Sequence, residues 1–142
     1  MFDDLVEYVC ENYSRASKIV ELGVGSRIDV AEKIKKSLPL VEVLVTDKDE
    51  SWVRKHGTGQ IRAVADDVRF PQTPIYQNAS LVYSIQPPFE IVEPMILLAR
   101  RIGADLLVVP RSDEQETFHQ NQWEKLVRKG RTLGWLRVHR RH

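Results

Sequence analysis

The chain has 142 residues, 42% of them hydrophobic and 29% charged, and its net charge is +1. This length suits one domain rather than two, and a nearly neutral chain gives no general argument for a nucleic-acid or membrane partner. The single cysteine, Cys10, excludes a disulfide or a cysteine metal site within the chain, and in the absence of a long apolar run we expect no membrane span, no signal peptide and a cytoplasmic protein.

Apolar spacing alternates between helical and strand periods along the whole chain. In chain order it predicts a helix over 2–14, a strand over 18–22, a helix over 28–38, a strand over 41–46, a short helix over 49–56, a strand over about 60–65, at most one turn around 71–74, a strand over 79–85, a helix over about 91–102, a strand over 104–109, a polar amphipathic helix over 115–129 and a strand over 132–138. This alternation predicts an α/β fold of Rossmann type, a three-layer αβα sandwich with a mainly parallel sheet in the order 3-2-1-4-5 plus one edge strand. Neither a repeat nor a linker interrupts the pattern, so residues 1–142 are expected to form one domain.

Two glycines, Gly23 and Gly25, lie between the first expected strand and the helix that follows it. Ligands of such sheets bind above the carboxyl ends of the strands, and Gly-x-Gly at this point lets the backbone approach them closely. The alternative is a tight turn that binds nothing. Glu21 and Asp29 place carboxylates beside the helix end, which disfavours a pyrophosphate, and Ile28 stands where a dinucleotide fingerprint has its third glycine. Acidic neighbours suit the ammonium and sulfonium of S-adenosylmethionine.

Acidic residues also follow the second and third expected strands. Asp47 comes 24 residues after Gly23, the spacing at which an acid reaches ribose hydroxyls. Asp49 is an alternative for that role, or it caps the next helix. Asp66 and Asp67 follow the third strand, and either carboxylate could accept a hydrogen bond from an adenine amino group; the alternative is a solvated pair on a loop.

Together these residues resemble the class I S-adenosylmethionine-dependent methyltransferases. The segment Glu21–Gly25 is similar to their first motif, in which the acid faces the methionine ammonium. Asp47 corresponds to their ribose-binding acid, and Asp66, five residues before Pro71, to their adenine-contacting acid. The resemblance implies an S-adenosylmethionine cofactor bound at Glu21, Gly23, Gly25, Asp47, Asp66 and Asp67.

A second resemblance covers most of the chain. Residues 64–68, 83–88 and 103–108 are similar to uncharacterised protein family 0146, a group of short archaeal Rossmann-like proteins with no established activity. This resemblance therefore implies the fold and no function.

The chain departs from the methyltransferase pattern in two places. Arg27 stands where many of those enzymes have a third glycine. One strand is expected after residue 130, whereas a complete methyltransferase sheet ends in an antiparallel pair. A catalyst of this size would need its substrate or a partner protein to supply binding surface.

The loop after the fourth expected strand contains Gln86, two prolines and Phe89. It resembles the Asn/Asp-Pro-Pro-aromatic motif of amino-methyltransferases, with Gln86 as an acceptor one methylene longer and Phe89 as the ring that stacks on the substrate. These two residues are the catalytic candidates. The alternative is a Pro-Pro turn that ends the strand, with Phe89 packed against the core.

The charges of the chain are unevenly distributed. Acids precede the first basic residue, namely Asp3, Asp4, Glu7 and Glu11. After Glu124 the charged residues are all basic, namely Lys125, Arg128, Lys129, Arg131, Arg137, Arg140 and Arg141. This segment is interpreted either as a contact for RNA or a protein substrate, with Trp123 and Trp135 available to stack on bases, or as a solvated edge with Trp135 packed inward.

Three functions remain after these observations. The first is a methyltransferase-like protein acting on a nitrogen of RNA or protein, by in-line displacement. The second is a non-catalytic module, a sensor or partner subunit, that binds S-adenosylmethionine or another nucleoside. The third, a nicotinamide-dependent oxidoreductase, is disfavoured by the acidic first turn. The four histidines have no metal-ligand spacing, so no metal site is expected.

Overall fold

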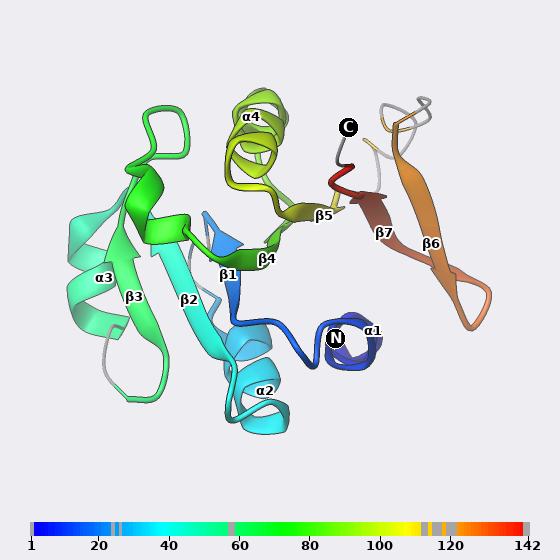
Figure 1. Cartoon of the computed structure of the whole chain (residues 1–142), viewed down its shortest axis with the longest axis horizontal. Coiled ribbons are helices and arrows are strands. Elements are labelled where there is room, and N and C mark those ends of the chain that lie inside the picture. The colour runs from blue at the N-terminus through cyan, green and yellow to red at the C-terminus, as the bar shows by residue number, and fades with distance from the viewer. Residues whose placement is uncertain are drawn as a thin grey trace.

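A seven-stranded sheet in the order β3-β2-β1-β4-β5-β7-β6 runs through the centre of the computed structural model (Figure 1). The structure describes residues 2–23, 25, 27–56, 59–111, 114, 118 and 122–140. Its strands are β1 (Lys18–Leu22), β2 (Glu42–Asp47), β3 (Arg62–Ala65), β4 (Ala79–Ile85), β5 (Asp105–Val109), β6 (Glu124–Arg128) and β7 (Arg131–Arg137). Its helices are α1 (Asp3–Asn12), α2 (Asp29–Ser37), α3 (Glu50–His56) and α4 (Val92–Ile102), with short 3-10 helices η1 (Thr73–Tyr76) and η2 (Phe89–Ile91).

The five strands from β1 to β5 form the parallel part of the sheet. Their order, β3-β2-β1-β4-β5, is the one expected from right-handed crossovers, and each neighbouring pair is parallel. The Rossmann-type fold predicted from the sequence is therefore confirmed.

The end of the sheet differs from the prediction. The single edge strand is wrong, because β6 and β7 form an antiparallel hairpin in which β7 lies between β5 and β6. The helix expected over 115–129 is also wrong where it covers β6, and most of its earlier part lies outside the described residues. Lys129 and Gly130 connect the two strands with φ of 53° and 73°, the two left-handed positions of a tight hairpin turn.

A register shift between Leu126 and Val127 explains why the spacing of apolar residues does not predict β6 as a strand. The shift interrupts the alternation of inward and outward side chains. The five residues of β6, three of them charged, therefore fit the period of the polar helix expected over 115–129. Opposite the shift, Gly134 of β7 fits closely against β5: a Cβ there would lie 2.9 Å from the Val108 carbonyl oxygen. The pairing of β7 with β5, which no local pattern reports, decides the structure of this segment.

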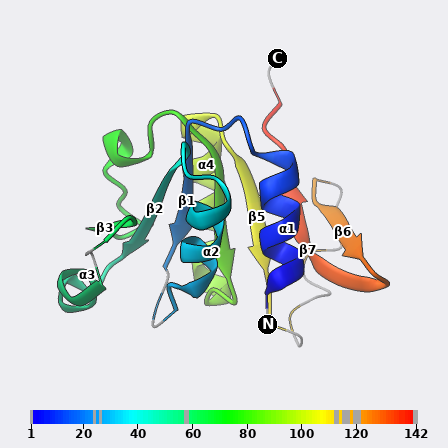
Figure 2. The ribbon, with the colours of Figure 1, turned by 90° about the horizontal axis from the view of Figure 1, so that it is seen from below.

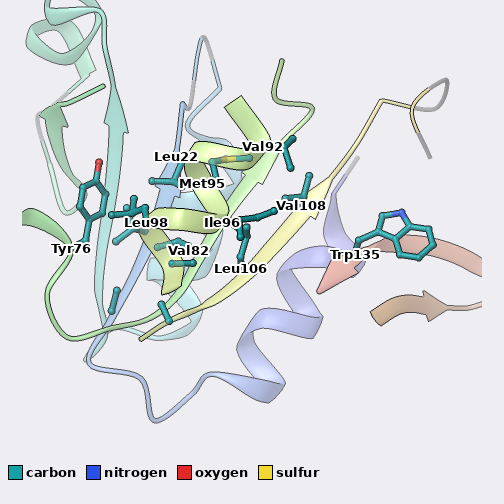
Figure 3. Close-up of a cluster of buried hydrophobic side chains, with 14 of the residues drawn as sticks. Leu22, Tyr76, Val82, Val92, Met95, Ile96, Leu98, Leu106, Val108 and Trp135 are labelled. Carbon is teal, nitrogen blue, oxygen red and sulfur yellow. The ribbon is translucent and has the colours of Figure 1, made fainter. Parts of the chain in front are cut away.

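The two faces of the sheet carry separate hydrophobic cores. Alternate residues of β1 divide between them, with Ile19 under α1 and α2, and Val20 and Leu22 under α4. Figure 2 shows α1 and α2 together on one face, and Figure 3 the core beneath α4, which extends to Trp135 of β7. Trp135 is 3% exposed, so its inward packing, one of the two interpretations, is what the structure has.

Ion pairs between α1 and the β6–β7 turn account for much of the uneven charge distribution. Arg128 lies 3.5 Å from Glu7 and 2.7 Å from Glu11, and Lys129 lies 3.1 Å from Asp4. Exposed pairs of this kind contribute little to stability. Two of the seven terminal basic residues are thus neutralised within the chain and offer little to an anionic partner.

Within the described ranges, no helix has the length and apolar character needed to cross a membrane.

Candidate functional site

The glycine turn after β1 and the acid after β2 meet at the carboxyl edge of the sheet. Gly23 and Gly25 have φ of 60° and 63°, a conformation that side chains with a Cβ rarely adopt. The Gly25 backbone N–H donates to Asp47 Oδ2 at 2.8 Å. A Cβ on Gly25 would meet no described atom within 4 Å, so the turn presents an open backbone surface beside the Asp47 carboxylate.

Asp47 and Asp49 have different roles in the structure. Asp49 accepts from the backbone N–H groups of Ser51 at 2.9 Å and Trp52 at 3.2 Å, and so caps α3. Asp47 is half-buried and accepts from the Asp49 N–H at 2.9 Å as well as from Gly25. Since a carboxylate has about four acceptor positions, Asp47 retains capacity for ribose hydroxyls, and Asp49 is left with its capping role.

Asp66 holds its own loop together. It is 8% exposed, and its Oδ1 accepts from the Gln72 N–H at 3.1 Å while its Oδ2 accepts from the Tyr76 hydroxyl at 2.5 Å. Burial, followed by the adjacent Asp66 carboxylate, raises the pKa of Tyr76. Contact with adenine stays a prediction for Asp66, whose oxygens already have partners in η1 and the segment before it.

Asp67 closes the turn after β3. Its Oδ1 accepts from the Arg69 backbone N–H at 3.0 Å, and this hydrogen bond is the main reason that the pKa of Asp67 is lowered. Phe70, at the end of this turn, is highly exposed beside the same edge of the sheet. The pair Asp66–Asp67 is thus one buried acid and one half-buried acid, rather than two equivalent ones.

Glu21 is the most unusual acid of the site, because it is 2% exposed. It is the register partner of Tyr83 in the neighbouring strand β4, and the Tyr83 hydroxyl donates to its Oε1 at 2.8 Å. Burial raises the pKa of Glu21 to about 8, although the Tyr83 hydrogen bond acts in the opposite direction. With this pKa, Glu21 is mostly protonated at neutral pH, and the positive charge of a ligand beside it would favour the ionised form.

Arg27 and Phe2 join the site from the side of α1. The Arg27 guanidinium lies 5.0 Å from the centre of the Phe2 ring, and its charge lowers the pKa of Glu21 in opposition to burial. No motif in the sequence distinguishes Phe2, which lies within the helix expected over 2–14. Val24 and Ser26, the remaining residues of the turn, lie outside the described part of the chain.

The loop after β4 lies against the glycine turn. A Cβ on Gly23 would be 3.9 Å from Cδ1 of Ile91 in η2, so this loop borders the open backbone of the turn. Gln86 is exposed with φ of 51°, and its N–H donates to the Val109 carbonyl at 2.6 Å. Phe89 is 51% exposed, which does not fit the alternative in which it packs against the core.

Glu90 is an exposed acid of this loop, whereas the hydroxyls of the strand before it are already engaged. The Ser84 hydroxyl is buried and donates to the Leu22 carbonyl at 2.9 Å, and the Tyr83 hydroxyl is committed to Glu21. Among the residues that the structure places, no three metal-binding side chains gather at one point. The arrangement can hold and orient a ligand, and it offers a side-chain amide and a ring at the mouth of the site.

Comparison with known proteins identifies the family to which the chain is similar. The model of a family described as Uncharacterised protein family (UPF0146) matches residues 2–137. A UPF0146 protein of Methanothermobacter thermautotrophicus is 34% identical over 132 residues, which are 93% of this chain and 91% of that protein.

Solved structures extend the comparison to the fold. A putative S-adenosyl-L-methionine-dependent methyltransferase from Methanococcus maripaludis superposes with a TM-score of 0.60 at 11% identity, covering 97% of this chain and 84% of the other. A predicted O-methyltransferase from Agrobacterium tumefaciens gives 0.53 at 18% identity, covering 73% of this chain, which spans 59% of that protein. At such low identity the likeness concerns the fold alone. The chain has the fold of the class I methyltransferases and belongs to the uncharacterised protein family UPF0146.

Proposed function

We propose that this protein binds S-adenosylmethionine at the carboxyl edge of its sheet and acts as a methyltransferase-like protein in the cytoplasm. The observation that carries the proposal is the hydrogen bond from the Gly25 N–H to Asp47, which joins the glycine turn to the candidate ribose acid. The antiparallel β6–β7 pair supports it, because a complete methyltransferase sheet ends in such a pair. The methyltransferase fold of the solved neighbours supports it further.

Ligand binding should be visible as thermal stabilisation. S-adenosylmethionine or S-adenosylhomocysteine at a hundred times its dissociation constant should add about 2.7 kcal/mol, a rise in melting temperature on the order of 10 °C. NAD, NADP and ATP at the same concentration should have little effect, since the acidic turn disfavours phosphate groups. A clear shift with NAD and none with S-adenosylmethionine would overturn the proposal.

Asp47→Asn tests the ribose contact, with Asp49→Asn as its matched control. Losing one carboxylate acceptor should weaken binding by about tenfold, which halves the stabilisation at the same ligand concentration. Asp49→Asn should leave the shift intact, since asparagine also caps helices well. Equal losses in both variants would count against Asp47 as the ribose acid.

Gln86 and Phe89 are proposed to border the reacting atoms, with the Gln86 amide oxygen accepting from a target nitrogen. Gln86→Asn is expected to fold at least as well as the parent, because asparagine tolerates a positive φ better than most residues, and to retain methyl transfer. Phe89→Ala should cost less than about 1 kcal/mol of stability for a half-exposed ring and abolish transfer. The assay is transfer of a tritium-labelled methyl group to transcribed RNA or to an unmodified peptide library.

The competing outcome for Phe89 is a packing role. In that case Phe89→Ala would lower the free energy of unfolding by the ~3–5 kcal/mol typical of a buried aromatic.

A non-catalytic module that binds the same cofactor is the second candidate. The observation that favours it is that the hydroxyls nearest the loop, of Tyr83 and Ser84, are both committed to β1. Neither is free to remove a proton from an acceptor. Cofactor binding with no labelled methyl group on either RNA or peptide would support this candidate over the enzyme.

A further inference from the structure

A groove of about 620 Å³ lies on the α4 face, away from the candidate cofactor site. Its walls come from α4, the start of β5, and the segments at the end of β7 and the start of β6. Figure 3 shows three elements of this region, with Ile96 on α4, Leu106 on β5 and Trp135 on β7. Its volume is in the range of small-molecule sites.

Three arginines line the groove, and one of them was not among the basic residues singled out from the sequence. Arg100 comes from α4, Arg137 from β7 and Arg140 from the segment after it. Burial and then the charge of Arg100 lower the pKa of Arg137. Two guanidinium groups thus repel one another in a partly desolvated place, and an anion between them would offset that cost.

Few of the nearby acids compensate this charge. Glu93 is the one acid whose charge raises the pKa of Arg137. Glu124 also lines the groove, and its charge raises the pKa of Tyr8 and Tyr13, which belong to the core on the α1 face. Within the described segments, no carboxylate lies within ion-pair distance of Arg100 or Arg140.

The aromatic residues of the groove are already engaged. The Arg137 guanidinium lies 5.6 Å from the Trp123 ring centre, and the Phe118 ring packs edge-on to Trp123 at 5.0 Å. Trp135 is buried. Base stacking on these tryptophans, one interpretation of the sequence, stays a prediction, and the contacts define the groove chiefly by its guanidinium groups.

The groove lies at the opposite edge of the sheet from the glycine turn. The His139 N–H donates to Asp105 Oδ1 at 2.8 Å, which fixes the segment after β7 beside the first residue of β5. Strands of five residues separate the two edges by roughly 17 Å. An anion in the groove is consequently a different ligand from the proposed cofactor, and its binding can be measured without one.

We propose that this groove binds adjacent phosphate groups, held by Arg100, Arg137 and Arg140. The backbone of single-stranded RNA and a free polyphosphate offer the same chemistry. An RNA chain would follow the groove through phosphates alone, with little dependence on base sequence. The proposed binding site for an anion is therefore three arginines from two parts of the sequence, rather than the whole basic end of the chain.

The experiment measures the binding of a fluorescein-labelled 12-nucleotide oligouridylate by anisotropy at about 50 and 200 mM NaCl. The variants are Arg100→Ala and Arg100→Ala/Arg137→Ala, with Arg131→Ala as control, since Arg131 is an exposed arginine of β7 outside the groove. Arg100 is exposed on a helix, so its alanine variant should fold like the wild type. This single variant therefore tests the proposal even if the loss of Arg137, which lies over Trp123, disturbs the hairpin in the double variant.

Each lost phosphate contact should lower the affinity at 50 mM salt by about tenfold and flatten the plot of log K against log salt by about 0.7. Arg131→Ala should change neither by much. Unlabelled tripolyphosphate separates the two sources: competition at lower concentration than the RNA indicates a free polyphosphate, and weaker competition indicates the RNA backbone. Absence of binding by both probes at 50 mM salt, or an equal loss in Arg131→Ala, overturns the proposal.

Discussion

Glu21→Gln is expected to abolish a fall in stability of up to about 5 kcal/mol that wild-type protein shows as the pH rises from 4.5 to 8. The pKa of Glu21 is raised from 4.5 to about 8 in the folded protein, mainly because its carboxyl group is buried. Between these values the folded chain keeps a proton that the unfolded chain has lost. The stabilisation is therefore fully present below pH 4.5, declines with rising pH, and is gone once the pH exceeds about 8.

Urea unfolding at intervals between pH 5 and pH 9 measures this dependence. Glutamine mimics the protonated acid, keeps an oxygen for the Tyr83 hydroxyl and does not titrate, so its curve should be nearly flat where that of the wild type falls. Asp49→Asn, a change at an exposed acid, controls for general charge effects and should follow the wild type. Parallel curves for the wild type and Glu21→Gln would show that Glu21 does not carry an abnormal pKa.

Asp66→Ala is expected to lower the free energy of unfolding by on the order of 3 kcal/mol, and the melting temperature by roughly 10 °C. The Tyr76 hydroxyl, in a side chain that is 0% exposed, would lose the acceptor of its hydrogen bond, and so would the Gln72 N–H. Asp67→Ala removes the neighbouring acid, which lies at the surface of the turn, and should cost well under 1 kcal/mol.

This pair of variants also separates two roles for Asp66. The contacts with η1 predict a large loss of stability, while an adenine contact predicts that the rise in melting temperature with S-adenosylmethionine disappears. If Asp66→Ala melts like the wild type and responds no longer to the ligand, the acid serves the cofactor and not the loop. Differential scanning fluorimetry with and without ligand gives both readings.

The parallel half of the sheet could be predicted because its signals are local. Buried strands, helix faces and a Gly-x-Gly turn can each be recognised from residues that are close in sequence. The preference for right-handed crossovers then predicts the order of the strands in the sheet. Asp47 was found in the same way, since the end of a strand and a fixed spacing place it.

The missed features depend on pairs that are far apart in sequence. Glu21 meets Tyr83 from 62 positions away, so neither its burial nor its protonation could be predicted from its neighbours. The role of Asp66 within its own loop could not be predicted, because its partner, Tyr76, lies in a 3-10 helix ten residues later. No pattern in the sequence distinguishes Arg100, whose charge acts on Arg137 only once the fold brings the two together.

The position of β7 inside the sheet has a consequence for the order in which the protein can assemble. The free edge of β5 pairs with a strand that begins at residue 131, 22 positions after β5 ends at residue 109. Until that strand is made, Leu106, Leu107 and Val108 present unpaired backbone groups on an apolar strand, the kind of edge that promotes aggregation. During synthesis the chain therefore passes through a stage in which this apolar edge of β5 is open, and pairing with β7 closes it.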